Sequence, residues 1–124
     1  MSVLACLECA VLLWLVHLLL QANLTGASFS YLFSSRDEPP PQPGLVGARA
    51  ARAFRNYMES FPAFVALDLA FLATNHPAGI WPTLWIAARI VYLPLYLFSV
   101  VYVRTAVWLI SIVAVVAMLI RLAL

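Results

Sequence analysis

The sequence predicts an all-α, polytopic membrane protein that folds as a bundle of four transmembrane helices. Of its 124 residues, 65% are hydrophobic and 10% are charged, and the mean hydropathy is +0.99. Soluble domains carry about 25% charged residues, so this chain could not cover a water-facing surface with charge. We expect one membrane domain, residues 1–124, with helices at about residues 2–22, 45–75, 80–102 and 104–122.

The first apolar segment, residues 2–22, is long enough to cross the hydrocarbon core of a bilayer. Glu8 is the only charged residue before Arg36, and no convincing small-residue cleavage site interrupts the run. A signal peptide would need a positive n-region and such a site, so we expect a retained helix. The prolines at about 35–44 cannot continue a helix and favour a solvated, extended loop.

The second segment, residues 45–75, is longer than the roughly 20 residues that a transmembrane helix needs. Its surplus turns should project from the membrane, and they carry arginines. Pro62 removes one backbone hydrogen bond, which predicts a bend beside Glu59. A tight turn from Asn75 to Gly79 leads to the third segment, residues 80–102.

The arginines predict the orientation in the membrane. Four arginines lie in the first connection and at the start of the second segment: Arg36, Arg49, Arg52 and Arg55. A fifth, Arg104, lies at the junction before the fourth segment. The positive-inside rule places these connections in the cytoplasm and both termini on the other side. Arg121 alone counts against this orientation.

Two polar faces enter the apolar segments. At about 100° per residue, one helical face of the second segment carries Arg49, Arg52, Asn56 and Glu59. One face of the third segment carries Arg89, Tyr92 and Tyr96. Ionisable groups in a membrane are costly and normally face partners or a wet cavity, so these faces are candidate functional sites.

The two faces are expected to meet in the cytoplasmic half. If segments two and three are antiparallel about Pro77, residues equally distant from Pro77 share a depth. Glu59 and Tyr96 are almost equidistant from it, and so are Arg52 and Arg104. The sequence therefore predicts a cationic, phenol-lined pocket there.

Other polar residues are expected to have structural roles. Glu8, Asp68 and Arg89 fall at similar depth in the outer half, where we expect them to pair with one another. Cys6 and Cys9 have the spacing of a zinc half-site, but both histidines are too distant to complete four ligands, so buried free thiols are expected. His17 is expected to be a packed helix histidine, although its depth allows it to border the pocket.

The run Arg-Ala-Phe-Arg-Asn-Tyr-Met-Glu at residues 52–59, followed by Pro62, resembles the helix-two signature of the MAPEG family, the membrane-associated proteins in eicosanoid and glutathione metabolism. The Arg-Asp-Glu-Pro-Pro-Pro loop at residues 36–41 is similar to its bacterial branch. So is the run that contains Ala88, Arg89, Tyr92, Tyr96 and Arg104. Together these motifs extend the resemblance over nearly the whole chain.

The resemblance implies a homotrimer in the bacterial inner membrane, with glutathione bound between subunits near the cytoplasmic face. The family's glutathione-binding residues match Arg52, Asn56, Glu59, Tyr92 and Tyr96 here. Its thiolate-stabilising arginine has its nearest match in Arg104. The implied activity is that of a glutathione-dependent transferase or peroxidase acting on a lipophilic small molecule. No metal is implied.

Two positions depart from the family pattern. Phe54 occupies a place where the eicosanoid enzymes tend to have a polar residue. Arg104 lies eight residues beyond Tyr96, about 80° off its face on a continuous helix, and a break near Tyr102 could correct its direction.

The alternative interpretation belongs to another class of function. In it the chain is a non-catalytic membrane protein whose polar cluster binds lipid headgroups or only stabilises a trimer. Nucleic acid is not an expected partner, because the net charge is only +2 and no basic cluster alternates with aromatic residues.

Overall fold

The computed structural model describes residues 1–24, 26, 31, 33–35, 37 and 43–124, and these residues form four helices and no strand. The helices are α1 (Val3–Leu24), α3 (Leu45–Thr74), α4 (Trp81–Leu97) and α5 (Val101–Ala123). The predicted all-α bundle is confirmed. Most of the predicted proline-rich loop, 35–44, lies outside the described residues.

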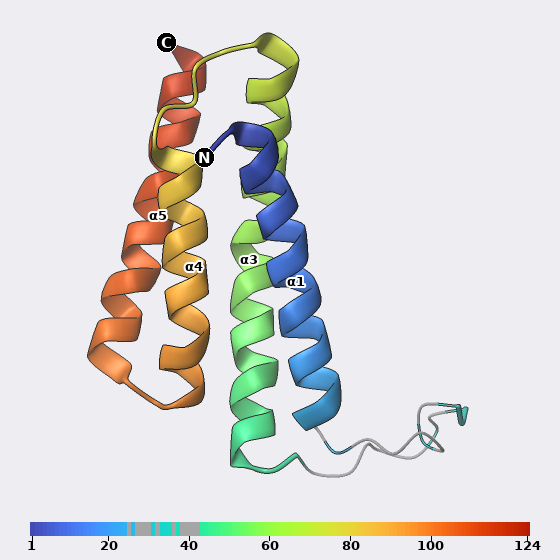
Figure 1. The fold of residues 1–124 in the computed structure, drawn as a ribbon. Helices are drawn as coiled ribbons and strands as arrows, with labels where there is room; N and C mark the ends of the chain where they lie inside the picture. Colours follow the sequence, from blue (N-terminus) through green and yellow to red (C-terminus); the bar gives the residue numbers. More distant parts are fainter. Residues whose placement is uncertain (25, 27–30, 32, 36, 38–42) are drawn as a thin grey trace.

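The helices form two neighbouring pairs, with α1 beside α3 and α4 beside α5 (Figure 1). Both chain termini lie towards one end of the bundle, the same end as the connection 75–80. The starts of α3 and α5 lie at the other end. We call it the arginine end, because the first three turns of α3 carry Arg49, Arg52 and Arg55 and the first turn of α5 carries Arg104. Three of the helices, α1, α3 and α5, are long and apolar enough to cross a membrane.

The third helix is shorter than predicted, because α4 ends at Leu97 rather than near residue 102. The amide of Ser99 donates to the carbonyl of Tyr96, and the amide of Val100 donates to that of Leu95. With Ser99 at φ 64°, these bonds form a Schellman motif, the usual way in which a helix stops at a left-handed residue. The chain therefore turns at 98–100, and α5 begins three residues before the predicted Arg104.

The register of α3 against α4 also differs from the prediction. Asn75, at φ 52°, ends α3, and the connection 75–80 then descends beside α5, so that α4 starts well below the end of α3 (Figure 1). Asn56 consequently lies opposite Arg89. A symmetrical turn about Pro77 would instead have placed Asn56 opposite Phe98.

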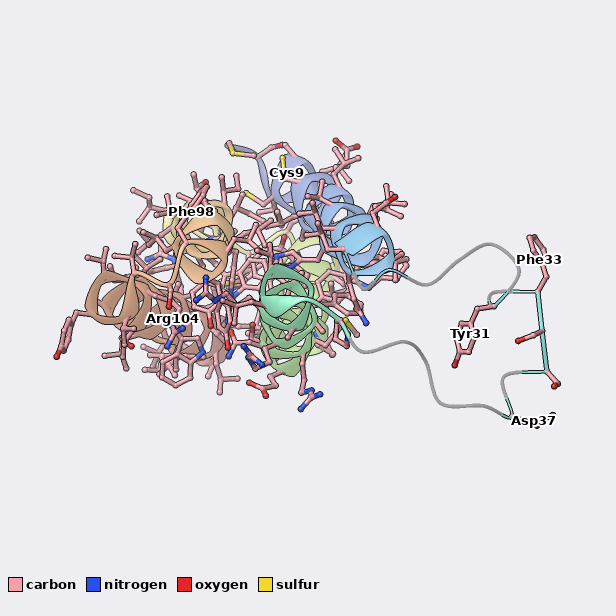
Figure 2. All side chains as sticks on the ribbon, turned by 90° about the horizontal axis from the view of Figure 1, so that it is seen from below. Cys9, Tyr31, Phe33, Asp37, Phe98 and Arg104 are labelled. Carbon is pink, nitrogen blue, oxygen red and sulfur yellow. The ribbon has the colours of Figure 1, made fainter. Side chains whose placement is uncertain are left out.

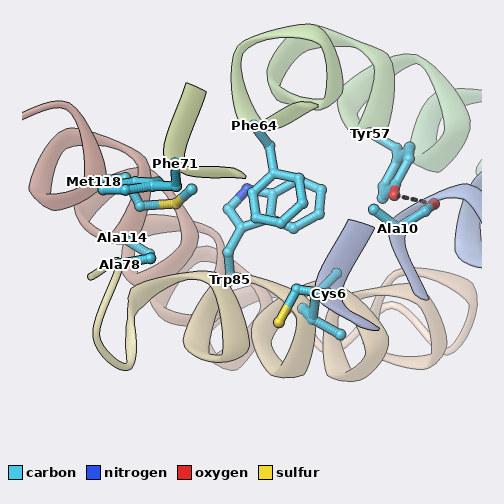
Figure 3. Packing of buried hydrophobic residues seen from close by; sticks show 10 residues of the cluster. Cys6, Ala10, Tyr57, Phe64, Phe71, Ala78, Trp85, Ala114 and Met118 are labelled. Atoms are coloured by element: carbon cyan, nitrogen blue, oxygen red, sulfur yellow. Dashed lines mark hydrogen bonds between the residues drawn. The ribbon is translucent and has the colours of Figure 1, made fainter. Parts of the chain in front are cut away.

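The core between the helix pairs contains a group of packed aromatic rings. The ring of Phe64 stacks on Trp85 with centroids 3.9 Å apart, and both side chains are fully buried (Figure 3). Tyr57 packs 5.6 Å from Trp85, and its hydroxyl donates to the carbonyl of Ala10 at 2.7 Å. This bond joins α1 to α3 inside the apolar core, where an unpaired hydroxyl would be costly.

Candidate functional site

The polar cluster at the centre of the bundle is organised by Arg89. Arg89 is 1% exposed, although it carries a charge inside a membrane bundle. Nη1 donates to Asn56 Oδ1 at 2.8 Å, and Nη2 donates to Ser60 Oγ at 2.6 Å. These charge-assisted bonds replace part of the hydration that the guanidinium loses on burial.

Aromatic rings cover the same guanidinium. Its Cζ atom lies 5.5 Å from the ring centroid of Trp85 and 5.5 Å from that of Tyr92. Cation–π contacts of this length are worth more in a site from which water is excluded than at a surface. Arg89 is therefore held by α3 on one side and by its own helix on the other.

The second polar element is a row of side chains that leads from α4 to α5. The rings of Tyr92 and Tyr96 lie 5.5 Å apart, and Arg104 Cζ lies 4.5 Å from the ring of Tyr96. The ring of Tyr92 also lies against Arg89, so this row is continuous with the buried guanidinium. Seen from the arginine end, nitrogen and oxygen atoms gather beside Arg104, between α5 and α3 (Figure 2).

The predicted site residues on α3 fall into two groups. Asn56 is half-buried, and its Nδ2 donates to Glu59 Oε2 at 3.2 Å. Arg52 and Glu59 are exposed on the single subunit, and Arg52 makes no side-chain hydrogen bond within the described residues. The α3 face is thus anchored at Asn56 and open at Arg52 and Glu59.

Arg104 lies near Tyr96, in spite of the expected 80° offset, because the turn at 98–100 separates the two helices. The break comes a few residues earlier than the expected position near Tyr102. Arg49, which the sequence places on the same α3 face, donates from Nη1 to the carbonyl of Leu97 at 3.0 Å. That bond ties the start of α3 to the last turn of α4.

The expected pairing of Glu8, Asp68 and Arg89 is wrong. Arg89 lies at the level of Asn56 and Ser60, because α4 starts lower than a symmetrical turn allows. Glu8 is exposed on α1. Asp68 is 0% exposed, and both of its carboxylate oxygens lack a hydrogen-bond partner within the described residues.

The sequence interpretation missed two parts of the site, Ser60 and the link between Arg89 and Asn56. A signal for the link was present, because Arg89 shares a helical face with Tyr92 and Tyr96. Ser60 lies one turn after Asn56 on α3, where a small hydroxyl facing α4 can accept from a guanidinium.

Both cysteines and the histidine of α1 pack within the bundle. Cys6 is buried, Cys9 is half-buried, and both are free thiols. Within the described residues, no three potential metal ligands come together. His17 is 1% exposed and stacks on Tyr57 with ring centroids 4.7 Å apart.

The fold and these contacts define a class: a small helical membrane protein with cationic and phenolic side chains gathered between its helices. The sequence model of the MAPEG family matches residues 6–124, and the chain belongs to that family. Neither the curated proteins nor the solved structures contain a match to the chain.

The bond between Arg89 and Ser60 can be measured by a double-mutant cycle. We expect Arg89→Ala and Ser60→Ala to be non-additive, with a coupling of about 1.5–3 kcal/mol, because the bond joins a buried charge to a hydroxyl. Unfolding of the detergent-solubilised protein by a denaturing detergent measures it. Arg121→Ala, which removes an exposed arginine at the other end, should not couple with Ser60→Ala. Additive effects of Arg89→Ala and Ser60→Ala would contradict the assigned bond.

Asp68→Asn tests whether the buried carboxyl has a role in stability. Because its oxygens have no partner, removing the possibility of charge at constant volume should leave the stability within about 1 kcal/mol of wild type or raise it. The same unfolding assay applies, with the exposed Glu8→Gln as control. A loss of about 3–5 kcal/mol would instead show that Asp68 is one half of a buried ion pair.

Proposed function

We propose that the protein binds glutathione at the open face of α3 and uses it as a transferase or peroxidase substrate against lipophilic electrophiles. The observation that supports this most is a row of contacts across three helices. It runs from Glu59 and Asn56 on α3, through Arg89, Tyr92 and Tyr96 on α4, to Arg104 on α5. A cationic and phenolic cluster of this kind suits an anionic thiol compound. Membership of the MAPEG family supports the same proposal.

The side chains match the chemical groups of the tripeptide. Glutathione carries two carboxylates and one ammonium. The guanidinium of Arg52 is free to bind a carboxylate through two parallel hydrogen bonds. Glu59 accepts from Asn56 through Oε2, which leaves Oε1 for an ammonium group.

Thiol activation is assigned to Arg104. A thiol becomes a strong nucleophile only after it loses its proton, and a nearby cation in a site of low polarity favours the thiolate. The guanidinium of Arg104 lies against the ring of Tyr96, at the mouth of the cluster. A thiolate held there could open an epoxide, displace a leaving group or reduce a hydroperoxide dissolved in the bilayer.

A second subunit would complete this site. Arg52 and Glu59 are exposed on the single chain, so a ligand bound to them would be uncovered on one side. A homotrimer, in which a neighbouring copy packs over this face, would enclose the ligand and exclude water. We place the arginine end on the cytoplasmic side of a bacterial inner membrane, because it carries the arginines of α3 and Arg104.

One observation favours the alternative of a non-catalytic membrane protein. Arg89 donates to Asn56 and Ser60 within one subunit and leaves only Nε without a partner among the described residues, so part of the polar cluster contributes to packing. In this alternative the exposed Arg52 and Glu59 would hold lipid headgroups or contact another copy only. The two functions differ in whether glutathione binds.

Glutathione binding should depend on the open face. We expect Arg52→Ala and Glu59→Ala each to weaken binding by about tenfold or more, since each removes a charge-assisted contact. Calorimetric titration of glutathione into the detergent-purified protein measures the effect. The matched control is Arg121→Ala, which removes an arginine at the opposite end and should leave the affinity unchanged. Wild-type affinity in both α3 variants would reject the proposed site.

Arg104→Leu should separate binding from reaction. We expect turnover with an aryl halide to fall on the order of a hundredfold, because a preorganised cation next to the developing charge is lost. Glutathione affinity should change little. Chloride release and calorimetry measure the two quantities on the same preparation. If affinity falls as much as turnover, Arg104 holds the ligand and does not act on the thiol.

A further inference from the structure

A second polar site lies at the end of the bundle opposite to the arginine end. The connection 75–80 and the last turns of α5 surround a cavity of about 420 Å³, a size common for small-ligand sites. Its wall combines two basic side chains, His76 and Arg121, with Trp81 and the apolar Ile120. None of these residues belongs to the proposed glutathione site.

Arg121 is fixed at this cavity with its donors free. Its Nε donates to the carbonyl of Pro77 at 2.6 Å, which orients the guanidinium. Its Cζ atom lies 3.5 Å from where a Cβ of Gly79 would stand, so the group also lies against the connection. Nη1 and Nη2 make no hydrogen bond within the described residues, and the lining of the cavity also includes Leu124. Two neighbouring donors of one guanidinium match two oxygens of a phosphate.

The surroundings of the cavity suit a lipid. The cavity lies at the end of the membrane-crossing α5. Tryptophan is enriched at the headgroup level of bilayers, and Trp81 lines the wall. Ile120 is 54% exposed, and exposed apolar side chains continue along α5. A ligand with a phosphate and a long apolar chain would use both parts of this surface.

We propose that this cavity binds an anionic phospholipid, with its phosphate on Arg121 and His76 and an acyl chain along α5. A guanidinium beside an apolar wall suits a phosphate group that carries an acyl chain. Free phosphate would share the contact with Arg121 but would leave the apolar wall unused. The site would keep a structural lipid at the end where Arg121 is the only arginine that the described residues provide.

The test uses the tryptophan in the wall. Full-length protein in detergent is titrated with phosphatidylglycerol brominated close to the headgroup, and the bromine atoms quench tryptophan fluorescence. The part of this quenching that is lost in Trp81→Phe measures binding at this cavity. We expect phosphatidylglycerol to bind at least about fivefold more tightly than brominated phosphatidylcholine, since one arginine near the surface contributes about 1 kcal/mol towards an anionic lipid. High salt should reduce this preference in the wild type.

Arg121→Gln should abolish the preference, whereas Arg55→Gln, at the arginine end, should keep it. Arg121→Lys, which retains the charge without the fork, should keep only part of it. Far-UV circular dichroism and unfolding in a denaturing detergent report whether each variant is folded. Equal quenching by the two lipids in wild type would overturn the proposal. Competition by millimolar inorganic phosphate would also overturn it, because the cavity would then recognise a free anion.

Discussion

The rest of the structure depends on the burial of one guanidinium. Arg89 is 1% exposed and forms no ion pair within the described residues, so its charge is balanced only by hydrogen bonds and ring faces. Such a charge is tolerated in an apolar bundle only where the geometry of its partners is good. Asn56 and Ser60 supply those acceptors at one level of α3. The bonds therefore select one register between α3 and α4, and shifting that register would expose an uncompensated charge to the core.

The register then determines which groups can act together. Since α4 is held low against α3, Arg89 is bonded to Asn56 on one side and lies against the ring of Tyr92 on the other. The Schellman turn after Leu97 completes the arrangement, because it lets α5 begin close to Tyr96. Arg104 reaches the cluster through this turn. An uninterrupted helix would have directed it elsewhere.

The helices and one polar face of the candidate site could be predicted from the sequence. Composition and apolar length predicted the helices, and helical spacing predicted the polar face of Asn56 and Glu59. The end of α4 could not be predicted, because Ser99 stops the helix where neither glycine nor proline marks the stop. The depth of Arg89 could not be predicted either. It depends on how far the connection 75–80 descends, and a sequence carries no length signal for a descending loop.

Asn56 joins the two halves of the candidate site. Its amide oxygen accepts from Arg89, while its amide nitrogen donates to Glu59, so one side chain is bonded both to the buried charge and to the open face. A ligand that binds to Glu59 would therefore act, through Asn56, on the packing of α3 against α4. The closure of the proposed site would depend on a neighbouring copy, but the geometry of its floor depends on Arg89 within a single subunit. Loss of Arg89 should consequently disturb glutathione recognition without removing any group that contacts the ligand.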